Sequence, residues 1–369
     1  MTDVKVPLAD LRAQYDSIAG EVDVAIRGVL ERTDFILGKD VAAFEQEYAQ
    51  YCETAYAVGL DSGLGALELG MRALGIGPGD EVLTPANSFI ASSSAISFTG
   101  ATPAWYDVDP GTYNIDLDSA ARAITPRTKA LMVVHLYGQM PGMDAVLAFA
   151  REHNLPVVED ACQAHGARWK GKRAGGFGAF AAFSFYPGKN LGAYGDGGAL
   201  TTDSAELAEQ IRMMRNYGQR QKYNHVTLAW NRRLDSMQAA ILRVKLRRLD
   251  GWNARRREIA ARYDAELAGT GLALPVTLPD AEHVYHQYVV RVPGDRERFM
   301  AFLGERGIGT GLHYPVPIHL QECYADLGVG RGSFPVTEEV ADQIVSLPMA
   351  AELSDAQIDQ VIEAIRDYT

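Results

Sequence analysis

The chain contains little cysteine. Cys52, Cys162 and Cys323 are the only three in 369 residues, and they stand far apart. An odd number at these distances provides neither a disulfide framework nor the ligand spacing of a zinc site. We therefore expect no metal centre, and a reduced, cytoplasmic compartment is the simplest interpretation.

Long apolar runs and an excess of positive charge are also missing. No stretch is long enough to span a membrane, and the N-terminal residues include no apolar signal core. Lys and Arg number 35 against 47 Asp and Glu, a net charge of −12, which argues against a general nucleic-acid surface. An anionic substrate stays open, because one local pocket can be positive. We expect a globular enzyme without nucleic-acid or membrane partners.

The sequence does contain a regular alternation of strand and helix patterns. Strands are predicted at residues 57–60, 81–84, 103–108, 129–134, 156–160, 179–185 and 198–202. Apolar residues recur at helical spacing in residues 8–30, 41–51, 64–74, 88–98, 116–124 and 143–153. Such alternation is typical of βαβ units, so we predict an α/β protein with a mostly parallel mixed sheet between helices.

The last third of the chain has a different pattern. Residues 234–267 form a long, Arg-rich helical pattern that would bridge two domains, with the arginines from Arg243 to Arg257 on a solvated face. Beyond it we predict strands at 288–292 and 309–313 and helices at 297–306 and 355–367. We place a boundary near Gly251. Residues 1–250 would form an N-terminal segment and a large domain, and residues 251–369 a small C-terminal α/β domain.

A lysine follows one of the predicted strands. An apolar strand runs into Ser184, a turn follows, and Lys189 stands at the start of a Gly-rich segment. A catalytic lysine must be held on a rigid element and partly desolvated, so that its amine can be neutral and nucleophilic. The alternative is a solvated surface lysine, which is the usual state of a lysine taken alone.

An aspartate ends the strand at 156–160. Ligands bind outside the carboxyl ends of strands in open α/β sheets, and Asp160 stands at such an end. A buried carboxylate there can hold a pyridinium nitrogen protonated, which makes pyridoxal 5′-phosphate (PLP) an electron sink. The alternative is a helix N-cap or a loop aspartate.

A small-residue turn joins the strand at 57–60 to the next helix. It reads Asp61-Ser62-Gly63, and the backbone N–H groups and positive end of a helix that begins there favour a phosphate. The alternative is an ordinary strand-to-helix turn. A phosphate turn, an aspartate and a lysine in this order fit a PLP site.

With the blocks around them, these residues resemble the DegT/DnrJ/EryC1/StrS family of PLP-dependent nucleotide-sugar aminotransferases over nearly the full length. The matching blocks are Phe35-Ile-Leu-Gly38 with Phe44-Glu45, Ser62-Gly63-Leu64, Pro85–Ala91, Glu159–Ala167, Phe183–Asn190, Gly195–Gly198, Asn231–Gln238 and His313–His319. The resemblance implies the fold-type I architecture of aspartate aminotransferase. It also implies a small C-terminal domain and PLP as the cofactor.

The resemblance further implies the roles of individual residues. Lys189 would form the Schiff base with PLP and then move the proton, and Asp160 would pair with the pyridine nitrogen. The other cofactor contacts would be Gln163 at the ring hydroxyl, Phe89 stacked on the ring, Ser184 with the backbone of Ser62, Gly63 and Leu64 at the phosphate, and Asn231 at the phosphate of the neighbouring subunit. The contact from Asn231 implies a homodimer with shared active sites.

Two residues depart from the family pattern. Leu64 stands where many members have a threonine whose hydroxyl helps to bind phosphate, and Asp61 replaces a small or amide residue. Gly63-Leu64 and Ala164-His165-Gly166 resemble the motifs of the subgroup that aminates C-3 of dTDP-3-keto-6-deoxyhexoses. Relatives with histidine in place of Lys189 are dehydratases, so the lysine favours amino transfer. The expected donor is L-glutamate, its product is 2-oxoglutarate, and the expected kinetics are ping-pong.

Several His and Tyr side chains are candidates for contact with the nucleotide sugar, since both can hydrogen-bond sugar hydroxyls or a diphosphate. They are His165, Tyr186, His313, Tyr314 and His319. The alternatives are a structural role for His165 and a Pro-rich turn with packed aromatics at 313–319. Three other functions also stay open. They are C-4 amino transfer on a 4-keto nucleotide sugar, PLP-dependent sugar dehydration, and non-catalytic regulation by a PLP-binding protein.

Overall fold

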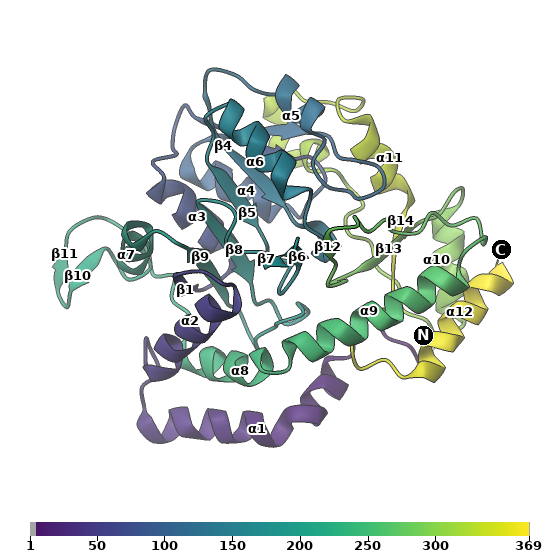
Figure 1. Ribbon diagram of the computed structural model, residues 1–369, viewed down its shortest axis with the longest axis horizontal. Helices are drawn as coiled ribbons and strands as arrows, with labels where there is room; N and C mark the ends of the chain where they lie inside the picture. The colour runs from purple at the N-terminus through teal and green to yellow at the C-terminus, as the bar shows by residue number, and fades with distance from the viewer. Residues whose placement is uncertain (1–4, 369) are drawn as a thin grey trace.

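A seven-stranded sheet forms the centre of the computed structural model, which describes residues 5–368 (Figure 1). In spatial order its strands are β1 (Tyr56–Leu60), β9 (Gly198–Thr202), β8 (Phe180–Ser184), β5 (Val157–Asp160), β4 (Thr128–Val134), β2 (Glu81–Pro85) and β3 (Thr102–Tyr106). β9 runs antiparallel to both of its neighbours, and the other pairs are parallel. The predicted α/β fold with a mostly parallel mixed sheet is confirmed.

Helices cover both faces of this sheet because its inner strands are apolar on both sides. In β4, Leu131 and Val133 pack into one layer, while Ala130 and Met132 pack into the other. The first layer contains α2 (Lys39–Tyr51), α5 (Leu117–Arg122), α6 (Met143–Glu152) and α8 (Ser236–Leu246), and the second contains α3 (Gly63–Ala73), α4 (Ala91–Thr99) and α7 (Ala205–Met214). Because β5 and β8 are parallel neighbours, their carboxyl ends lie together at one edge of the sheet.

A separate apolar core lies in the C-terminal part of the chain. It joins α9 (Leu249–Glu266), β13 (Tyr288–Arg291), α10 (Arg296–Glu305), β14 (Ile344–Leu347) and α12 (Asp355–Tyr368). Val6, from the other end of the chain, also packs in this core and forms a parallel bridge with Ile308. Gly251 lies in the first turn of α9, and the domain division there stays a prediction.

Two predictions about this part are wrong. The helix expected at 234–267 is two helices, α8 and α9, which follow one another along the molecule (Figure 1). The break arises because Arg247 and Arg248 have ψ angles of −17° and −15°, and the N–H of Arg248 donates to the carbonyl of Lys245, three residues earlier. Residues 309–313 do not form a strand, because Gly311 makes only an isolated bridge with Ser346.

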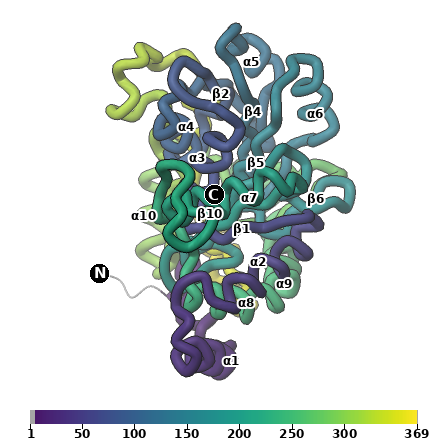
Figure 2. The backbone as a smooth tube through the Cα atoms, turned by 90° about the vertical axis from the view of Figure 1, so that its left-hand side faces the viewer, coloured from purple at the N-terminus to yellow at the C-terminus, as the bar shows by residue number. Residues whose placement is uncertain are grey.

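Shorter elements complete the described chain. They are the 3-10 helices η1 (Leu136–Gly138), η2 (Ile318–Leu320) and η3 (Glu322–Leu327), helix α11 (Pro335–Gln343), and strands β6 (Arg168–Trp169), β7 (Lys172–Arg173), β10 (Gln219–Gln221), β11 (Asn224–His225) and β12 (Ala281–Glu282). The hairpin of β10 and β11 projects from the body of the molecule beyond α7, and Figure 2 views it end-on. Between residues 5 and 368, no helix combines the length and the apolar character needed to cross a membrane.

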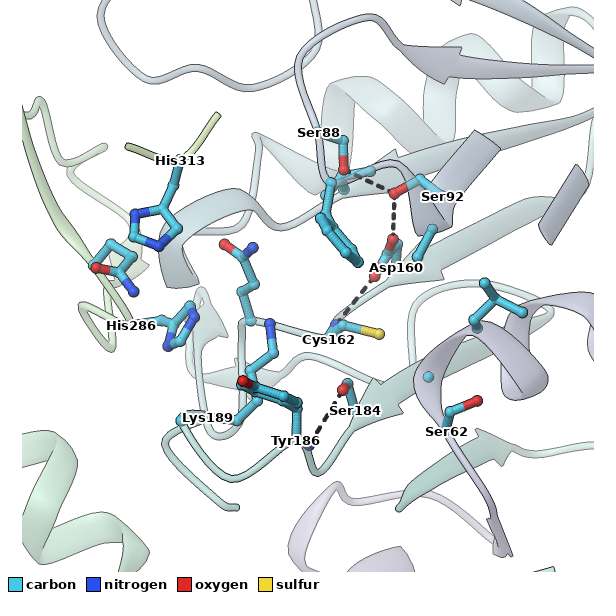
Figure 3. A pocket seen from close by; sticks show the side chains of 18 of the residues that line it. Ser62, Ser88, Ser92, Asp160, Cys162, Ser184, Tyr186, Lys189, His286 and His313 are labelled. Atoms are coloured by element: carbon cyan, nitrogen blue, oxygen red, sulfur yellow. Dashed lines mark hydrogen bonds between the residues drawn. The ribbon is translucent and has the colours of Figure 1, made fainter. Parts of the chain in front are cut away.

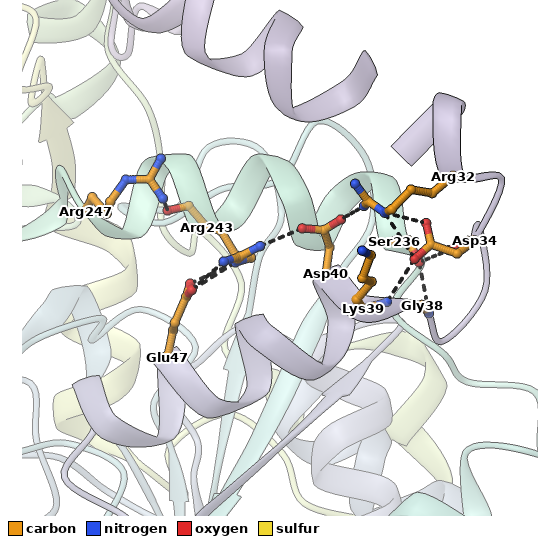
Figure 4. Close-up of polar contacts among 9 residues, drawn as sticks. All are labelled: Arg32, Asp34, Gly38, Lys39, Asp40, Glu47, Ser236, Arg243 and Arg247. Carbon is orange, nitrogen blue, oxygen red and sulfur yellow. Dashed lines mark hydrogen bonds and ion pairs between the residues drawn. The ribbon is translucent and has the colours of Figure 1, made fainter. Parts of the chain in front are cut away.

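Helix α1 (Leu11–Arg32) lies along α8, where Ile18 and Val22 pack against Ile241 and Val244. Charged side chains connect its end to α2 and α8 (Figure 4). Arg32 pairs with Asp40, and Arg243 donates to Asp40 at 2.6 Å and to Glu47 at 2.7 Å. These ion pairs fix the start of α2 against α8.

The turn between α1 and α2 is held by Ser236, the first residue of α8. Its backbone N–H donates to the carbonyl of Phe35 at 2.9 Å, and its hydroxyl accepts from the N–H of Gly38 at 3.1 Å. A side chain at Gly38 would collide with the carbonyl of Asp34. The turn therefore has one tight conformation, which leaves the side chains of Phe35 and Ile36 exposed.

Candidate active site

A cavity of about 620 Å³ lies at the carboxyl ends of β5 and β8 (Figure 3). The first turn of α3 forms part of its wall, and residues 286–287 and 313–314 of the C-terminal part form another. The predicted site residues that line it are Ser62, Gly63, Leu64, Phe89, Asp160, Gln163, Ser184, Tyr186, Lys189, His313 and Tyr314. Residues from distant parts of the chain thus meet around a space suited to a small molecule.

Lys189 follows β8 through a tight turn, in which its backbone N–H donates to the carbonyl of Tyr186 at 2.9 Å. Its side chain lines the cavity (Figure 3). The surrounding protein excludes water and so lowers the pKa of the Lys189 amine below its ordinary value, although Cys162 and Asp160 oppose this shift. A lowered pKa leaves more of the amine neutral and nucleophilic. The surroundings therefore differ from those of a solvated surface lysine.

Asp160 is the last residue of β5 and is buried. Its Oδ2 accepts a hydrogen bond from the hydroxyl of Ser92 at 2.7 Å, and its Oδ1 accepts one from the backbone N–H of Cys162 at 3.2 Å. The hydroxyl of Ser92 also contacts that of Ser88 at 2.7 Å. Residues 161–167, which directly follow Asp160, form turns and not a helix, so Asp160 is not a helix N-cap. The carboxylate is held in one orientation at the cavity wall.

The turn before α3 provides donors for an anion. Ser62 caps the helix, since its hydroxyl accepts from the N–H of Gly65 at 3.0 Å. The N–H groups of Gly63 and Leu64 belong to the first turn, which has no preceding helical carbonyls. A Cβ at Gly63 would stand 2.5 Å from the sulfur of Cys162 and 2.9 Å from Cβ of Ser184. Glycine is therefore required for this turn to approach Ser184 so closely.

Asp61, one of the two departures from the family pattern, has a structural explanation. Its Oδ2 lies 3.5 Å from Nη1 of Arg232, and Nη2 of the same arginine lies 2.6 Å from Oε2 of Glu68. Burial raises the pKa of Asp61, and the positive charge of Arg232 opposes that shift. Arg232 thus joins the turn before α3 to the helix itself through two carboxylates. Leu64, the other departure, lines the cavity without a hydroxyl.

Gln163 and Phe89 are placed on the cavity wall by neighbouring aromatic residues. The amide oxygen of Gln163 accepts from the backbone N–H of Tyr137 at 2.7 Å, and its amide nitrogen donates to the hydroxyl of Tyr314 at 3.1 Å. The ring of Phe89 lies 5.3 Å from that of Tyr314. Tyr314 therefore contacts both Gln163, expected at the ring hydroxyl, and Phe89, expected to stack on the ring.

Two histidines line the cavity on the side opposite the sheet (Figure 3). The Nδ1 of His313 contacts the hydroxyl of Ser346 at 2.8 Å, and burial lowers the pKa of His313 to about 4. His286 was not predicted from the sequence, and its Nδ1 lies 3.3 Å from Oδ1 of Asn190, the neighbour of Lys189. Burial lowers the pKa of His286 well below its ordinary value. Both rings are neutral near neutral pH, so they offer hydrogen bonds without charge.

Three residues predicted from the sequence do not line the cavity. His165 is buried against the rings of Phe183 and Phe185, and the Nε2 of His319 contacts Glu338 at 3.1 Å. The structural alternative fits both histidines, and substrate contact by their side chains is not supported. Asn231 is exposed near the projecting hairpin, and its role toward a second subunit stays a prediction.

These groups are arranged as PLP requires. The enclosed amine of Lys189 faces the same cavity as the oriented carboxylate of Asp160, and the first turn of α3 adds backbone donors for a phosphate beside Ser184. The amine would suit the aldehyde carbon of PLP, the carboxylate its ring nitrogen and the backbone N–H groups its phosphate. Fold and site together define a PLP-dependent enzyme.

The chain belongs to the DegT/DnrJ/EryC1/StrS aminotransferase family, whose sequence profile matches residues 16–366. It is 50% identical over 367 residues to the dTDP-3-amino-3,4,6-trideoxy-alpha-D-glucose transaminase of Streptomyces venezuelae, covering 99% of this chain and 96% of that one. The crystal structure of S. venezuelae DesV in complex with a ketimine intermediate matches with a TM-score of 0.96 at 50% identity, over 98% of both chains.

A further solved structure bears on the cofactor. NtdA from Bacillus subtilis with bound cofactor PMP, the amine form of PLP, matches with a TM-score of 0.92 at 32% identity, over 99% of this chain and 85% of that one. The protein is a PLP-dependent sugar aminotransferase that acts on a nucleotide sugar. The expected family, fold type and cofactor are confirmed.

Proposed function

We propose that this enzyme transfers the amino group of L-glutamate to C-3 of a dTDP-linked 3-keto-6-deoxyhexose. The observation that carries the proposal is the enclosed amine of Lys189 in the same cavity as the oriented carboxylate of Asp160. The position and the nucleotide are supported by the S. venezuelae relative, whose name specifies a dTDP-3-amino sugar.

Lys189 and Asp160 perform complementary tasks in this proposal. Bound PLP supplies an electron sink for the carbon atom that loses a proton. The neutral amine of Lys189 removes that proton from Cα of glutamate, and later gives a proton to C-3 of the sugar. Ser92 and the N–H of Cys162 hold the carboxylate of Asp160 in a fixed orientation, and its negative charge would keep the ring nitrogen protonated.

The remaining residues bind and orient the cofactor and the sugar. The N–H groups of Gly63 and Leu64 and the hydroxyl of Ser184 would hold the phosphate, and the backbone donors remain although Leu64 has no hydroxyl. Gln163 would contact the ring hydroxyl and Phe89 would cover the ring. On the sugar side, Tyr186, His313 and Tyr314 offer neutral donors and acceptors, which suit hydroxyl groups.

We also propose a homodimer in which each subunit completes the site of the other. The residues around the projecting hairpin carry apolar side chains in contact with solvent: Leu228 is 97% exposed and Tyr223 is 82% exposed. Phe35 and Ile36 add a second apolar edge on the fixed turn between α1 and α2. Asn231 follows the hairpin and would reach the phosphate of the partner subunit. A second copy covering these surfaces would bury them, as stable association requires.

A cytoplasmic location is part of the proposal. Cys52 is buried and Cys162 lies at the cavity wall, and both are free thiols, as is Cys323. Free thiols of this kind fit a reducing compartment.

The experiment that tests the function is incubation with L-glutamate and a panel of 3-keto and 4-keto nucleotide sugars. We expect 2-oxoglutarate and a sugar aminated at C-3, identified by mass and NMR. Amination at C-4 would support the alternative regiochemistry, and loss of a sugar hydroxyl without amino transfer would indicate a dehydratase. Uptake of PLP without conversion of glutamate or of any keto sugar would favour the non-catalytic regulatory alternative. Lys189→Ala should lower turnover by roughly a thousandfold or more.

Shared active sites have a separate test. Lys189→Ala and Asn231→Ala subunits are each expected to be weakly active, since each pure dimer has two defective sites. In a mixed dimer both defects fall in one site, which leaves the other intact. Random mixing should therefore restore about a quarter of the wild-type activity. No recovery on mixing, or a monomer in sedimentation, would contradict the shared site.

A further inference from the structure

Arg256 departs from the expectation of a solvated arginine face on the long helix. It lies on α9, is only 6% exposed, and lines the same cavity as Lys189. Arg255, its neighbour on the same helix, pairs instead with Asp355 at 2.7 Å and Glu258 at 3.2 Å, two exposed acidic side chains. The helix therefore turns one arginine inward to the cavity and one outward to solvent.

The hydrogen bonds of Arg256 involve only one of its three nitrogens. Nη1 donates to the carbonyls of Met349 at 2.9 Å, Tyr285 at 3.0 Å and His286 at 3.5 Å. Within residues 5–368, Nε and Nη2 make no hydrogen bond, and no carboxylate lies within ion-pair distance of this guanidinium, although the charge of Glu352 acts on it from farther away. Burial lowers the pKa of Arg256 to about 10, so the group is charged at neutral pH. A buried cation with unused donors is a site for an anion.

Few charges line this cavity in the described chain. They are the carboxylates of Asp160 and Asp196 and the cations of Lys189 and Arg256. Asp160 and Lys189 have roles at the cofactor in the proposed function, and Asp196 is exposed. His286 and His313 are neutral, as described above. Arg256 is therefore the cation on the cavity wall that stays available to a substrate.

A short chain of contacts connects Arg256 with the reacting amine. Its Nη1 contacts the backbone carbonyl of His286, and the ring of His286 contacts Asn190, which directly follows Lys189. Both cations line one cavity, and the charges of both act on the ring of His286. A compact ligand that presents an amino group to Lys189 and a carboxylate to Arg256 would complement these two groups.

We propose that Arg256 binds a carboxylate of the amino-acid donor. Arginine offers paired N–H groups in a plane that match a carboxylate, and such pairs are strong where water is excluded. The carbonyls of Tyr285 and Met349 fix the guanidinium in place before the donor arrives. A nucleotide diphosphate is the less suitable anion, because it is joined to a bulky nucleoside and Arg256 is deeply buried. This inference rests on the proposed amino-transfer function.

The test separates binding from reaction. Glutarate has the two carboxylates of glutamate without the amine, so it binds without being converted, and calorimetry on the PLP-loaded protein gives its Kd. We expect Arg256→Gln to weaken glutarate binding by about tenfold or more. Arg256→Lys keeps the charge without the planar fork and should weaken binding about three- to tenfold. Arg255→Gln, which changes the outward arginine, should bind glutarate like the wild type.

The two half-reactions distinguish the possible outcomes. In Arg256→Gln, the absorbance change of bound cofactor on adding L-glutamate should need about tenfold more donor, while the reaction of the amine form with the keto sugar keeps its KM. L-2-aminobutyrate lacks the side-chain carboxylate of glutamate, and 4-aminobutyrate lacks the α-carboxylate. If Arg256 binds one of these carboxylates, the compound without that carboxylate should react equally well with wild type and Arg256→Gln. A rise only in the KM of the sugar would overturn the proposal, as would unchanged glutarate binding in both variants.

Failure of this inference can be told from failure of the proposed function. If the wild-type protein shows no absorbance change with any amino acid, the amino-transfer function itself is wrong. If the wild type reacts with glutamate and both Arg256 variants match it, only the role of Arg256 is wrong. Arg256→Lys covers the case in which Arg256→Gln does not fold, because lysine can still donate to the carbonyl of Met349. Binding within twofold of the wild type in that variant would then overturn the proposal.

Discussion

Replacing Glu159 with glutamine should destabilise the edge of the sheet that carries Asp160. The two residues are consecutive in β5, so their side chains point to opposite faces, and Glu159 is fully buried. Its carboxylate accepts the backbone N–H groups of Phe177 at 2.8 Å, Gly178 at 2.9 Å and Gly175 at 3.1 Å, and lies 3.0 Å from Nε2 of His135. Each oxygen of the carboxylate has two of these four partners.

The size of the effect follows from that geometry. Glutamine keeps one oxygen, so two of the four partners face an amide NH₂ group instead of an acceptor. A buried donor that loses its acceptor costs about 1–3 kcal/mol, which gives about 2–6 kcal/mol for the substitution. The loops that contain Gly175 and Phe177 would be released first, because their N–H groups are held by this side chain.

The pH dependence has a definite sign. Burial alone would raise the pKa of Glu159, but hydrogen bonds from His135 and from backbone N–H groups lower it below its ordinary value of 4.5. A carboxyl group with a lowered pKa in the folded state contributes stability that is fully present above its unfolded pKa. This stability is lost as the pH falls through the folded value. The difference between wild type and Glu159→Gln should therefore be constant near neutral pH and narrow below pH 4.5.

Urea unfolding of the PLP-loaded protein, followed by circular dichroism, measures this difference. Glu209→Gln is the matched control, since Glu209 is exposed on α7, and it should unfold like the wild type. If Glu159→Gln lost less than about 1 kcal/mol near neutral pH, the four contacts would not be stabilising and the reasoning would be refuted.

Three further substitutions test two residues of the site and one buried lysine on α8. Gly63→Ala adds a carbon 2.5 Å from the sulfur of Cys162, so PLP should bind about tenfold more weakly in absorbance titrations, and unchanged affinity would count against the tight turn. Ser92→Ala removes the 2.7 Å bond to Asp160 and should lower kcat/KM about tenfold or more, whereas Ser17→Ala on α1 should have no effect. Burial lowers the pKa of Lys245 to about 8, so the unfolded chain retains this proton to higher pH. The melting temperature of wild type relative to Lys245→Met should therefore rise between pH 8 and pH 10.5, and a flat difference would refute it.

The sequence was sufficient to predict the large sheet because its strands are short apolar runs separated by amphipathic helices. β2, β4 and β5 are buried almost throughout, as parallel strands covered on both faces must be. Lys189, Asp160 and Ser62 were predictable for a related reason. Asp160 ends a strand, Ser62 precedes a helix and Lys189 follows a strand after a short turn, so chain order places all three near the carboxyl edge of the sheet.

The far wall of the cavity could not be predicted in this way, because packing of the C-terminal part brings it there. His286 and Tyr314 follow no regular pattern in the sequence, and only the folded chain places them near Asn190 and Gln163. Two other histidines show the reverse effect, because their positions in the structure do not support the predicted contact with substrate. His165 and His319 stand within family blocks, yet their rings pack against Phe185 and Phe334, respectively.

Helix α9 explains why Arg256 was assigned to a solvated surface. Two of its six buried residues, Asn253 and Arg256, are polar; the others are Leu249, Ile259, Ala260 and Tyr263. A search for apolar periodicity therefore finds almost no buried face on this helix. Both polar residues have buried partners, since Asn253 bonds the carbonyl of His165 and Arg256 bonds that of Met349. A polar residue in register with buried neighbours is costly unless it has such partners, and Arg256 retains donors beyond them. Those unused donors at the cavity wall are the physical reason to expect that a ligand completes its interactions.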